Sequence, residues 1–505
     1  MPALIIGIDL GATTTVVSRI NVVGEPQLVM NWDNAPFTDS AIWFPEDSPA
    51  QPIFGSTALG MVGVVEEGVF HEYKRDMGTE RVYHAHGKQY TPTELSAFML
   101  RKQREHIENT YDQKIDSVVI SVPANFLNEA RAATITAAKA AGFPDPITTI
   151  DESTAAALFY AYKAPIALNG KYLMVHFDAN TLDVTAFEAK DTQIEVKHSM
   201  GVSQLGDKSF NAATYDLVSQ KFKEKTGSNI EGHAACFSDF DVEKVKHRLT
   251  EVEKHEFKIY SALHGKVAVT VTRAEFEEQI SALITQLQYC IEAVLGKTGI
   301  SSSDLKGVFM TGVSSQIPAV QACVRRISGI KPTQEIDNRA VAHGAALFAA
   351  HRLGIRKPQT LWPEIKPATS RMRLIDVYPH YIGILERDWL TGKVRNRPII
   401  MKGAHLPQSH EFLLSADSGG AFPEIIISQC AFETTDRDDV TVLAEFHGHS
   451  TNGKPYAKGL LILEVDGNAV FKGKFKEIGT GKTTLFTMKH ETDAPPPPDI
   501  DDFIV

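Results

Sequence analysis

The sequence has few cysteines and no long apolar run. Its four cysteines, Cys236, Cys290, Cys323 and Cys430, stand far apart without a CxxC pair, so neither a zinc site nor a disulfide framework is expected. We expect buried free thiols in a reducing compartment. No window reaches the roughly eighteen apolar residues that a membrane helix needs, and the N-terminus lacks the basic segment of a secretory signal. These absences predict a cytoplasmic protein with no membrane partner.

Long runs of basic residues are also missing, and the net charge is −11 over 505 residues. Proteins that bind nucleic acid unassisted attract its phosphates with a basic face, so no nucleic-acid partner is expected. The composition, 43% apolar and 22% charged, is typical of a globular protein. The chain is too long for one ordinary hydrophobic core, and two or three domains are expected.

Strands and helices alternate in two separate parts of the chain. The segment LIIGIDLGATTTVV, residues 4–17, predicts a strand, a Gly/Thr turn and a second strand. Alternating strand and helix patterns follow at 115–163 and return at 306–354, which indicates an α/β fold. Residues 91–111 predict an amphipathic helix that begins with a Thr and a Glu three positions later. Residues 205–295 carry long helical patterns.

The texture changes after about residue 358, where alternating strands, Pro and Gly replace the helical patterns. A separate all-β domain is expected there. The last residues combine a polyproline stretch with several acids and predict an exposed tail. The expected organisation is an α/β domain over 1–360, a linker over 361–376, a β-domain over 377–490 and a Pro-rich acidic tail over 491–505.

Two turns carry acids and hydroxyls that suit phosphate and magnesium. In the first turn Gly11 lets the backbone approach a phosphate, and Asp9 can hold a hydrated Mg²⁺. In the second, Asp178 ends an apolar strand and is followed by Thr181 and Asp183. Two such hairpins in a duplicated domain would grip one nucleotide from both sides. Two ordinary, unrelated hairpins remain the alternative on this evidence alone.

Six segments follow one another along the chain: IIGIDLGATTTVV, ISVPANF, IDESTAAALFYAY, VTRAEFEE, GVFMTGVSSQIPAVQ and RAVAHGAALFAA. Together and in this order they resemble the DnaK, or heat shock protein 70, chaperone family. The resemblance implies an actin-like two-lobed nucleotide-binding domain followed by a β-sandwich substrate domain, with ATP or ADP and Mg²⁺ as cofactors.

The resemblance also implies roles for individual residues. Asp9 matches the acid that holds magnesium through water, and the catalytic positions are matched by Lys74, Glu152, Asp178 and Asp183. Phosphate and adenosine contacts are expected from Gly11, Ala12, Thr13, Thr14, Thr181, Glu243, Lys246, His247, Thr250, Gly312, Ser314 and Gln316. Glu243, Lys246, His247 and Thr250 have the spacing of one helix face. A solvated charged face is the alternative for these four.

The departures from the family pattern predict weak ATP binding or slow hydrolysis. Two residues separate Asp178 from Thr181, whereas the family has a short residue and three glycines, so the loop is shorter and stiffer. Ala12 replaces a threonine, Val313 replaces a glycine, and Asp207 and Lys208 replace a Gly-Glu pair.

The β-region resembles the family's linker end and β-sandwich more loosely. Leu374 and Ile375 keep the apolar character of the linker, but Arg371 and Arg373 do not, and weaker linker docking is expected. Only about fifteen residues follow the sandwich, so the helical lid of the family is expected to be missing.

Three function classes follow. The first is a divergent chaperone that binds extended polypeptide, with a J-domain co-chaperone or nucleotide-exchange factor as partner. The second is a pseudo-chaperone scaffold with little nucleotide dependence. The third, a sugar kinase on the actin-like fold, is disfavoured because a β-sandwich has no place in it.

Overall fold

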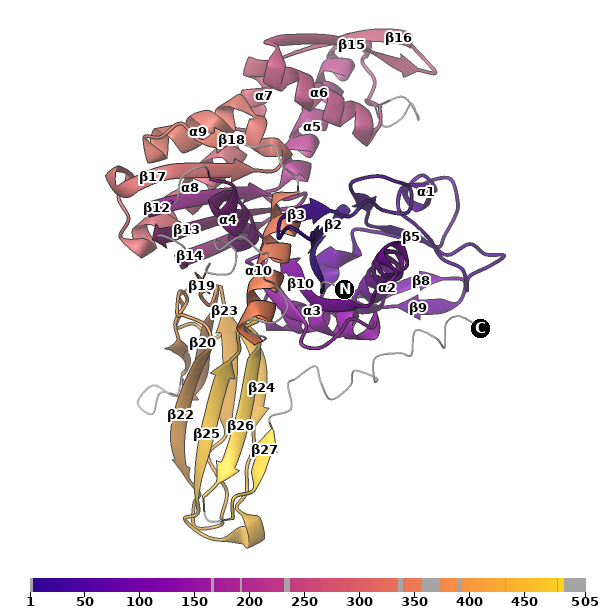
Figure 1. Ribbon diagram of the computed structural model, residues 1–505. Coiled ribbons are helices and arrows are strands. Elements are labelled where there is room, and N and C mark those ends of the chain that lie inside the picture. Colours follow the sequence, from indigo (N-terminus) through magenta and orange to yellow (C-terminus); the bar gives the residue numbers. More distant parts are fainter. Residues whose placement is uncertain are drawn as a thin grey trace.

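Two lobes lie side by side (Figure 1). A small helical subdomain, formed by helices and one hairpin within residues 207–279, lies at one end, and a β-domain projects from the other. This is a computed structural model, and it describes residues 3–164, 168–190, 193–230, 237–334, 339–356, 373–387, 393–431, 433–478 and 480–485. Among these residues no helix is both long and apolar enough to cross a membrane.

The central sheet of the first lobe has the strand order β11-β10-β1-β2-β3, and β4 also pairs with β2. Strand β1 is antiparallel to β2, where Leu10 faces Thr15, and parallel to β10. The bounds are β1 Leu4–Leu10, β2 Thr14–Ile20, β3 Pro26–Leu28, β4 Thr38–Asp39, β10 Ile115–Val122 and β11 Thr148–Asp151.

The second lobe repeats this arrangement with the order β18-β17-β12-β13-β14-β19. Strand β12 is antiparallel to β13, where Phe177 faces Leu182, and parallel to β17. The repeated order confirms the predicted two-lobed α/β domain and sets the two acid-bearing hairpins in equivalent positions. The bounds are β12 Gly170–Phe177, β13 Thr181–Lys190, β14 Gln193–Ser203, β17 Leu305–Thr311, β18 Thr333–Gln334 and β19 Arg373–Ile375.

Helices α4 (Glu152–Lys163) and α10 (Ala340–Arg356) pack against each other between the two sheets. Their small residues allow a close crossing: a Cβ on Gly344 would lie 1.8 Å from the carbonyl oxygen of Ala155. One buried cluster therefore spans both lobes and includes Ile5 of β1 and Met174 of β12.

The predicted helix over 91–111 is α2 (Pro92–Tyr111), which Thr91 caps as expected. The Thr91 hydroxyl accepts from the Glu94 amide, and the Glu94 carboxylate accepts from the Thr91 amide. The other elements of this lobe are β5 Ala41–Trp43, β6 Ile53–Phe54, α1 Ser56–Leu59, β7 Val69–His71, η1 Tyr73–Asp76, β8 Tyr83–Ala85, β9 Lys88–Tyr90 and α3 Asn128–Ala140.

The helical prediction for 205–295 was wrong in its middle. Strands β15 (Lys254–Ser261) and β16 (Gly265–Thr272) form an antiparallel hairpin there. Phe257 and Ile259 alternate with polar residues, so the apolar residues of this stretch repeat every two positions, as in a strand, and not with the helical period. Around the hairpin the helices are α5 Asp207–Thr226, α6 Asp239–Glu251, α7 Arg273–Gln279 and α8 Ser281–Thr298, with η3 Ser302–Asp304, η4 Val313–Gln316 and α9 Pro318–Ser328 further along.

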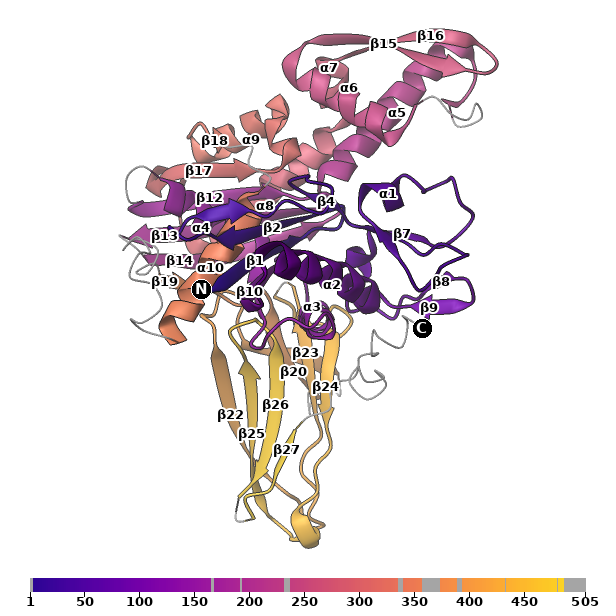
Figure 2. The same cartoon turned by 45° about the vertical axis from the view of Figure 1, so that its right-hand side comes forward.

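The β-domain is a sandwich of two four-stranded sheets, β21-β20-β23-β24 and β22-β25-β26-β27. Side chains such as Ile427, Leu461 and Phe471 fill the space between the sheets. The sandwich lies beneath α3 in both ribbon views (Figures 1 and 2). The bounds are β20 Tyr381–Arg387, β21 Val394–Ile400, β22 Gln408–Ser415, β23 Ile425–Cys430, β24 Thr441–Phe446, η5 Thr451–Gly453, β25 Lys458–Val465, β26 Phe471–Glu477 and β27 Thr483–Leu485.

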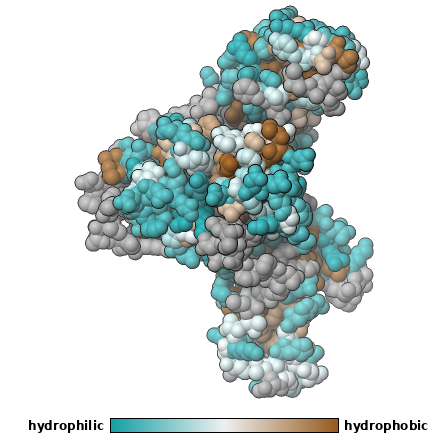
Figure 3. Space-filling model, turned by 90° about the vertical axis from the view of Figure 1, so that its right-hand side faces the viewer, coloured by the Kyte–Doolittle hydropathy of each residue, from teal (hydrophilic) through white to brown (hydrophobic). Residues whose placement is uncertain are grey.

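Some expectations fall outside the described residues: most of the linker, including Arg371, the acidic tail and Cys236. Cys290, Cys323 and Cys430 are buried free thiols, as predicted. The space-filling view shows a largely hydrophilic face with a small apolar area between the helical subdomain and the β-domain (Figure 3).

Candidate functional site

Three buried, charged side chains that lie next to one another connect the two lobes. Lys74 of η1 lies with its Nζ 2.8 Å from Oε1 of Glu152, the first residue of α4. On the other side of Glu152, Oε2 lies 3.7 Å from Nε2 of His176 in β12. All three residues are buried. Two cations from different lobes therefore hold one carboxylate between them.

The pKa values of these groups follow from their contacts. Burial alone would raise the Glu152 pKa, but Lys74 and His176 bring it down to about 2. Burial alone would lower the His176 pKa, but Glu152 raises it to about 9. Near pH 7 the Glu152 side chain is therefore a carboxylate that lies between two protonated partners, Lys74 and His176.

Three further carboxylates lie close to these charged side chains. Burial and the negative charge of Glu152 raise the pKa of Asp9 to about 7 and that of Asp183 to about 8. The same two causes raise the pKa of Asp178. Asp9 accepts a hydrogen bond from Ser121 Oγ at 2.8 Å. Such crowding favours a cation, which would relieve the repulsion.

The residues present fit a hydrated Mg²⁺. Among the described residues no group of three or more His, Cys, Asp or Glu side chains is placed to bind a metal directly. Buried oxygens with no hydrogen-bond partner nevertheless occur at Glu152 Oε2, Asp183 Oδ1 and Thr181 Oγ1. Carboxylates that contact the water shell, with Asp9 among them, match that pattern.

The first turn is held by its neighbour Ser40. The Ser40 hydroxyl donates to the Gly11 carbonyl at 2.8 Å, and its amide donates to the Thr13 carbonyl at 2.7 Å. Ala12 is buried, whereas Thr13 and Thr14 are half-buried. This turn lies beside Asp9 at the end of β1, as the sequence predicted.

Backbone groups of the second turn bond both within the turn and to the start of α5. The Asp178 amide donates to the Thr181 carbonyl at 2.9 Å, and the Ala179 amide bonds to the Asp178 carboxylate. The carbonyls of Asp178 and Ala179 accept from the amides of Asp207 and Lys208 at 2.9 and 2.8 Å. Two backbone donors of this tight turn, the amides of Asp178 and Ala179, are thus already bonded within the turn.

The expected adenosine contacts on α6 are only partly turned inward. Lys246 is buried, Thr250 is half-buried, and Glu243 and His247 are exposed. His247 lies 3.7 Å from Glu251 within the same helix. Of the four, Lys246 is therefore the one that points fully into the protein.

Lys246 forms an ion pair with a carboxylate of this protein. Its Nζ lies 2.6 Å from Oδ1 of Asp207, and the Ser314 hydroxyl donates to the same oxygen at 2.6 Å. Gly312, just before η4, has φ 92°, and a Cβ there would lie 1.9 Å from the Phe177 carbonyl oxygen. Val313 is 38% exposed beside it, and the fourth residue of η4, Gln316, is half-buried.

A family model described as Hsp70 protein matches residues 80–496, which is more than half of the chain. The chain belongs to the Hsp70 family. Members of this family are chaperones that bind ATP or ADP with Mg²⁺, and they bind polypeptide substrates and co-chaperones. The match begins after Asp9, the first turn and Lys74. Their assignment therefore rests on the repeated hairpin and on the contacts above.

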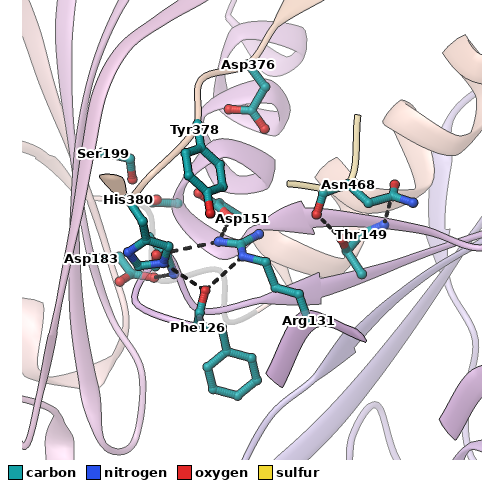
Figure 4. A network of polar contacts seen from close by, with 12 residues as sticks. Phe126, Arg131, Thr149, Asp151, Asp183, Ser199, Asp376, Tyr378, His380 and Asn468 are labelled. Carbon is teal, nitrogen blue, oxygen red and sulfur yellow. Dashed lines mark hydrogen bonds and ion pairs between the residues drawn. The ribbon is translucent and has the colours of Figure 1, made fainter. Parts of the chain in front are cut away.

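In this Hsp70 protein the charged site is connected to the β-domain through the segment before α3. The Ala124 amide donates to Asp183 Oδ2 at 3.2 Å. Two residues later, the Phe126 carbonyl lies 2.8 Å from His380 Nε2 of the β-domain and 2.9 Å from Arg131 Nε (Figure 4). Arg131 is buried and pairs with Asp151 at 2.8 Å.

Further contacts fix the sandwich to the first lobe. The Asn128 amide donates to Gln429 Oε1 at 3.0 Å, and the Phe471 amide donates to Asn128 Oδ1 at 2.7 Å. The Thr149 hydroxyl donates to the Asn468 carbonyl at 3.2 Å (Figure 4). On the other lobe, the linker residue Leu374 faces Ile194 in a parallel pairing of β19 with β14.

Sequence reasoning missed two parts of this site. His176 stands in the apolar strand GKYLMVHF, and that lone buried imidazole was the available signal. The pairing of Asp207 with Lys246 joins residues far apart in the chain, and no local pattern announces it. The sequence shows Asp207 where the family has a glycine, but it gives no sign of the pairing with Lys246.

Proposed function

We propose that this Hsp70 protein is a chaperone that binds ATP or ADP weakly and hydrolyses ATP slowly. The observation that carries the proposal is the second turn, whose amides bond to its own Asp178 carboxylate and Thr181 carbonyl. Phosphoryl transfer depends on positioned donors at the transferred group. The second turn uses these amide donors for its own hydrogen bonds, so they are not available to position the transferred phosphate. We therefore expect a larger loss of ATP hydrolysis than of nucleotide binding.

The charged groups needed for the chemistry are present. Lys74 would neutralise charge on the terminal phosphate, while Glu152 and Asp178 would orient the attacking water and accept its hydrogen bonds. When bound, Mg²⁺ supplies charge neutralisation at the phosphates, and Asp9 would hold its water shell. Asp183 instead accepts from the Ala124 amide, which ties the second hairpin to the segment before α3.

We further propose that the β-domain holds extended polypeptide or a co-chaperone, such as a J-domain protein or a nucleotide-exchange factor. Support comes from family membership and from the contacts that dock the sandwich on the first lobe. Asp183 and His380 lie at the two ends of one backbone segment, Ala124–Phe126. A ligand that moves this segment would change both sites, and such coupling is reciprocal. A cytoplasmic location stays a prediction.

A second candidate is a scaffold with little nucleotide dependence. The pairing of Lys246 with Asp207 favours it, because the cation expected at adenosine already has a partner. Calorimetric titration of the full chain with ATP and ADP, with and without Mg²⁺, separates the two. The chaperone proposal expects weak, Mg²⁺-dependent binding together with a change in affinity for an apolar extended peptide. Peptide binding that ignores saturating nucleotide would support the scaffold instead.

A further inference from the structure

The Asp207 carboxylate binds two side chains that are expected to contact adenosine. Lys246 Nζ and Ser314 Oγ both lie 2.6 Å from Asp207 Oδ1, and the side chains of Lys246 and Ser314 are buried. Charge-assisted hydrogen bonds of this length are among the stronger ones in proteins. The Asp207 carboxylate therefore acts as an internal ligand of these two side chains.

The next residue, Lys208, contacts the first lobe. Its ammonium contacts the carboxylate of Glu72, which directly precedes η1 in the first lobe. Lys208 lies in the first turn of α5, which belongs to the second half of the domain. This ion pair therefore connects the start of α5 with the first lobe close to Lys74.

The backbone fixes both side chains in place. The amides of Asp207 and Lys208 donate to the carbonyls of Asp178 and Ala179 in the second turn. The start of α5, the second turn, Lys246, Ser314 and Glu72 are thereby joined in one connected set of contacts.

We propose that Asp207 and Lys208 form an internal latch that competes with nucleotide for the cleft. The inference rests on the proposed function, because it takes the Lys246 and Ser314 region as the adenosine side of the site. Nucleotide would have to displace the Asp207 carboxylate, and its phosphates would approach that negative charge. When only a fraction of the molecules is open, the apparent affinity falls by that fraction.

The first test removes the carboxylate. Asp207→Gly and Asp207→Asn, made in the full chain, should each bind ADP at least about tenfold more tightly than the natural protein by calorimetry. Asp216→Asn is the matched control, because it removes the same charge from an exposed position of the same helix. A folded Asp207→Asn protein with unchanged or weaker ADP affinity would overturn the proposal and leave the pair a structural contact only.

The second test uses the half-exposed lysine, where substitution threatens folding less. Lys208→Met and Glu72→Gln should each raise the association rate of a fluorescent ADP analogue by about threefold or more. The double variant should match the faster single one, because both remove the same contact. Unchanged rates in both single variants would contradict the Lys208 part of the latch.

The latch and the proposed function fail in different ways. Fast ATP turnover by the natural protein would refute slow hydrolysis, yet a gain of affinity in Asp207→Asn would still support the latch. Slow turnover without any gain of affinity would remove the latch alone.

Discussion

Lys74 Nζ lies 2.8 Å from Glu152 Oε1, and both side chains are buried. Breaking a buried pair by removing one partner leaves an uncompensated charge. Lys74→Ala should therefore lower the free energy of unfolding by about 3–5 kcal/mol in urea titrations. Lys139→Ala, which removes an exposed lysine 4.0 Å from Asp145, should change it by less than about 1 kcal/mol. Equal effects of the two substitutions would contradict the importance given to the buried pair.

Asp9 is expected to act on Mg²⁺ rather than on adenosine. Asp9→Ala should weaken ATP binding in the presence of Mg²⁺ by on the order of 1–3 kcal/mol, the range of a lost charge-assisted hydrogen bond. In EDTA the variant and the natural protein should bind ATP alike. Paired titrations with and without Mg²⁺ measure this difference, and an equal loss in both buffers would remove Asp9 from the metal site.

Asp376, between the linker strand and the sandwich, should make stability depend on pH. Burial and the nearby Asp151 raise its pKa to about 7, although Arg131 and the Val377 amide oppose the shift. The folded state thus binds this proton more tightly than the unfolded state. Its stabilisation is complete below about pH 4 and is lost as the pH rises through about 7.

Asp376→Asn keeps the shape of the side chain but removes the charge. The variant should be more stable than the natural protein at pH 8 by about 1–3 kcal/mol, with a smaller difference at pH 5. Denaturant titrations at the two pH values measure this change. Parallel stability curves for the two proteins would show that Asp376 does not titrate as described.

The sequence predicted those parts of the fold that local patterns determine. The hairpin of Leu4–Val17, the capping of α2 by Thr91 and Glu94, and the repeated strand and helix order all depend on neighbours in the chain. The β15–β16 hairpin was missed because long helices flank it on both sides. Its alternating Phe257 and Ile259 carried a signal that the surrounding helical patterns obscured.

The candidate site was predictable as a set of residue types but not as a set of contacts. Asp9, Lys74, Glu152, Asp178 and Asp183 do lie close together, and their roles in catalysis stay predictions. The partner of Lys246 could not be foreseen, because Asp207 comes to it from α5, and Ser314 of η4 reaches the same carboxylate, only when the lobe folds. Long-range pairs of this kind leave no trace in residue spacing.

Single-turnover hydrolysis of ATP by the full chain tests the central claim most directly. The natural protein should turn over at least about tenfold more slowly than an Hsp70 protein with the complete glycine-rich turn, a loss of ~1.4 kcal/mol in transition-state stabilisation. Rebuilding Asp178 to Thr181 as Asp-Leu-Gly-Gly-Gly-Thr should raise the rate, because it restores free backbone donors. Hydrolysis by the natural protein at the rate of the glycine-rich relative would contradict the account.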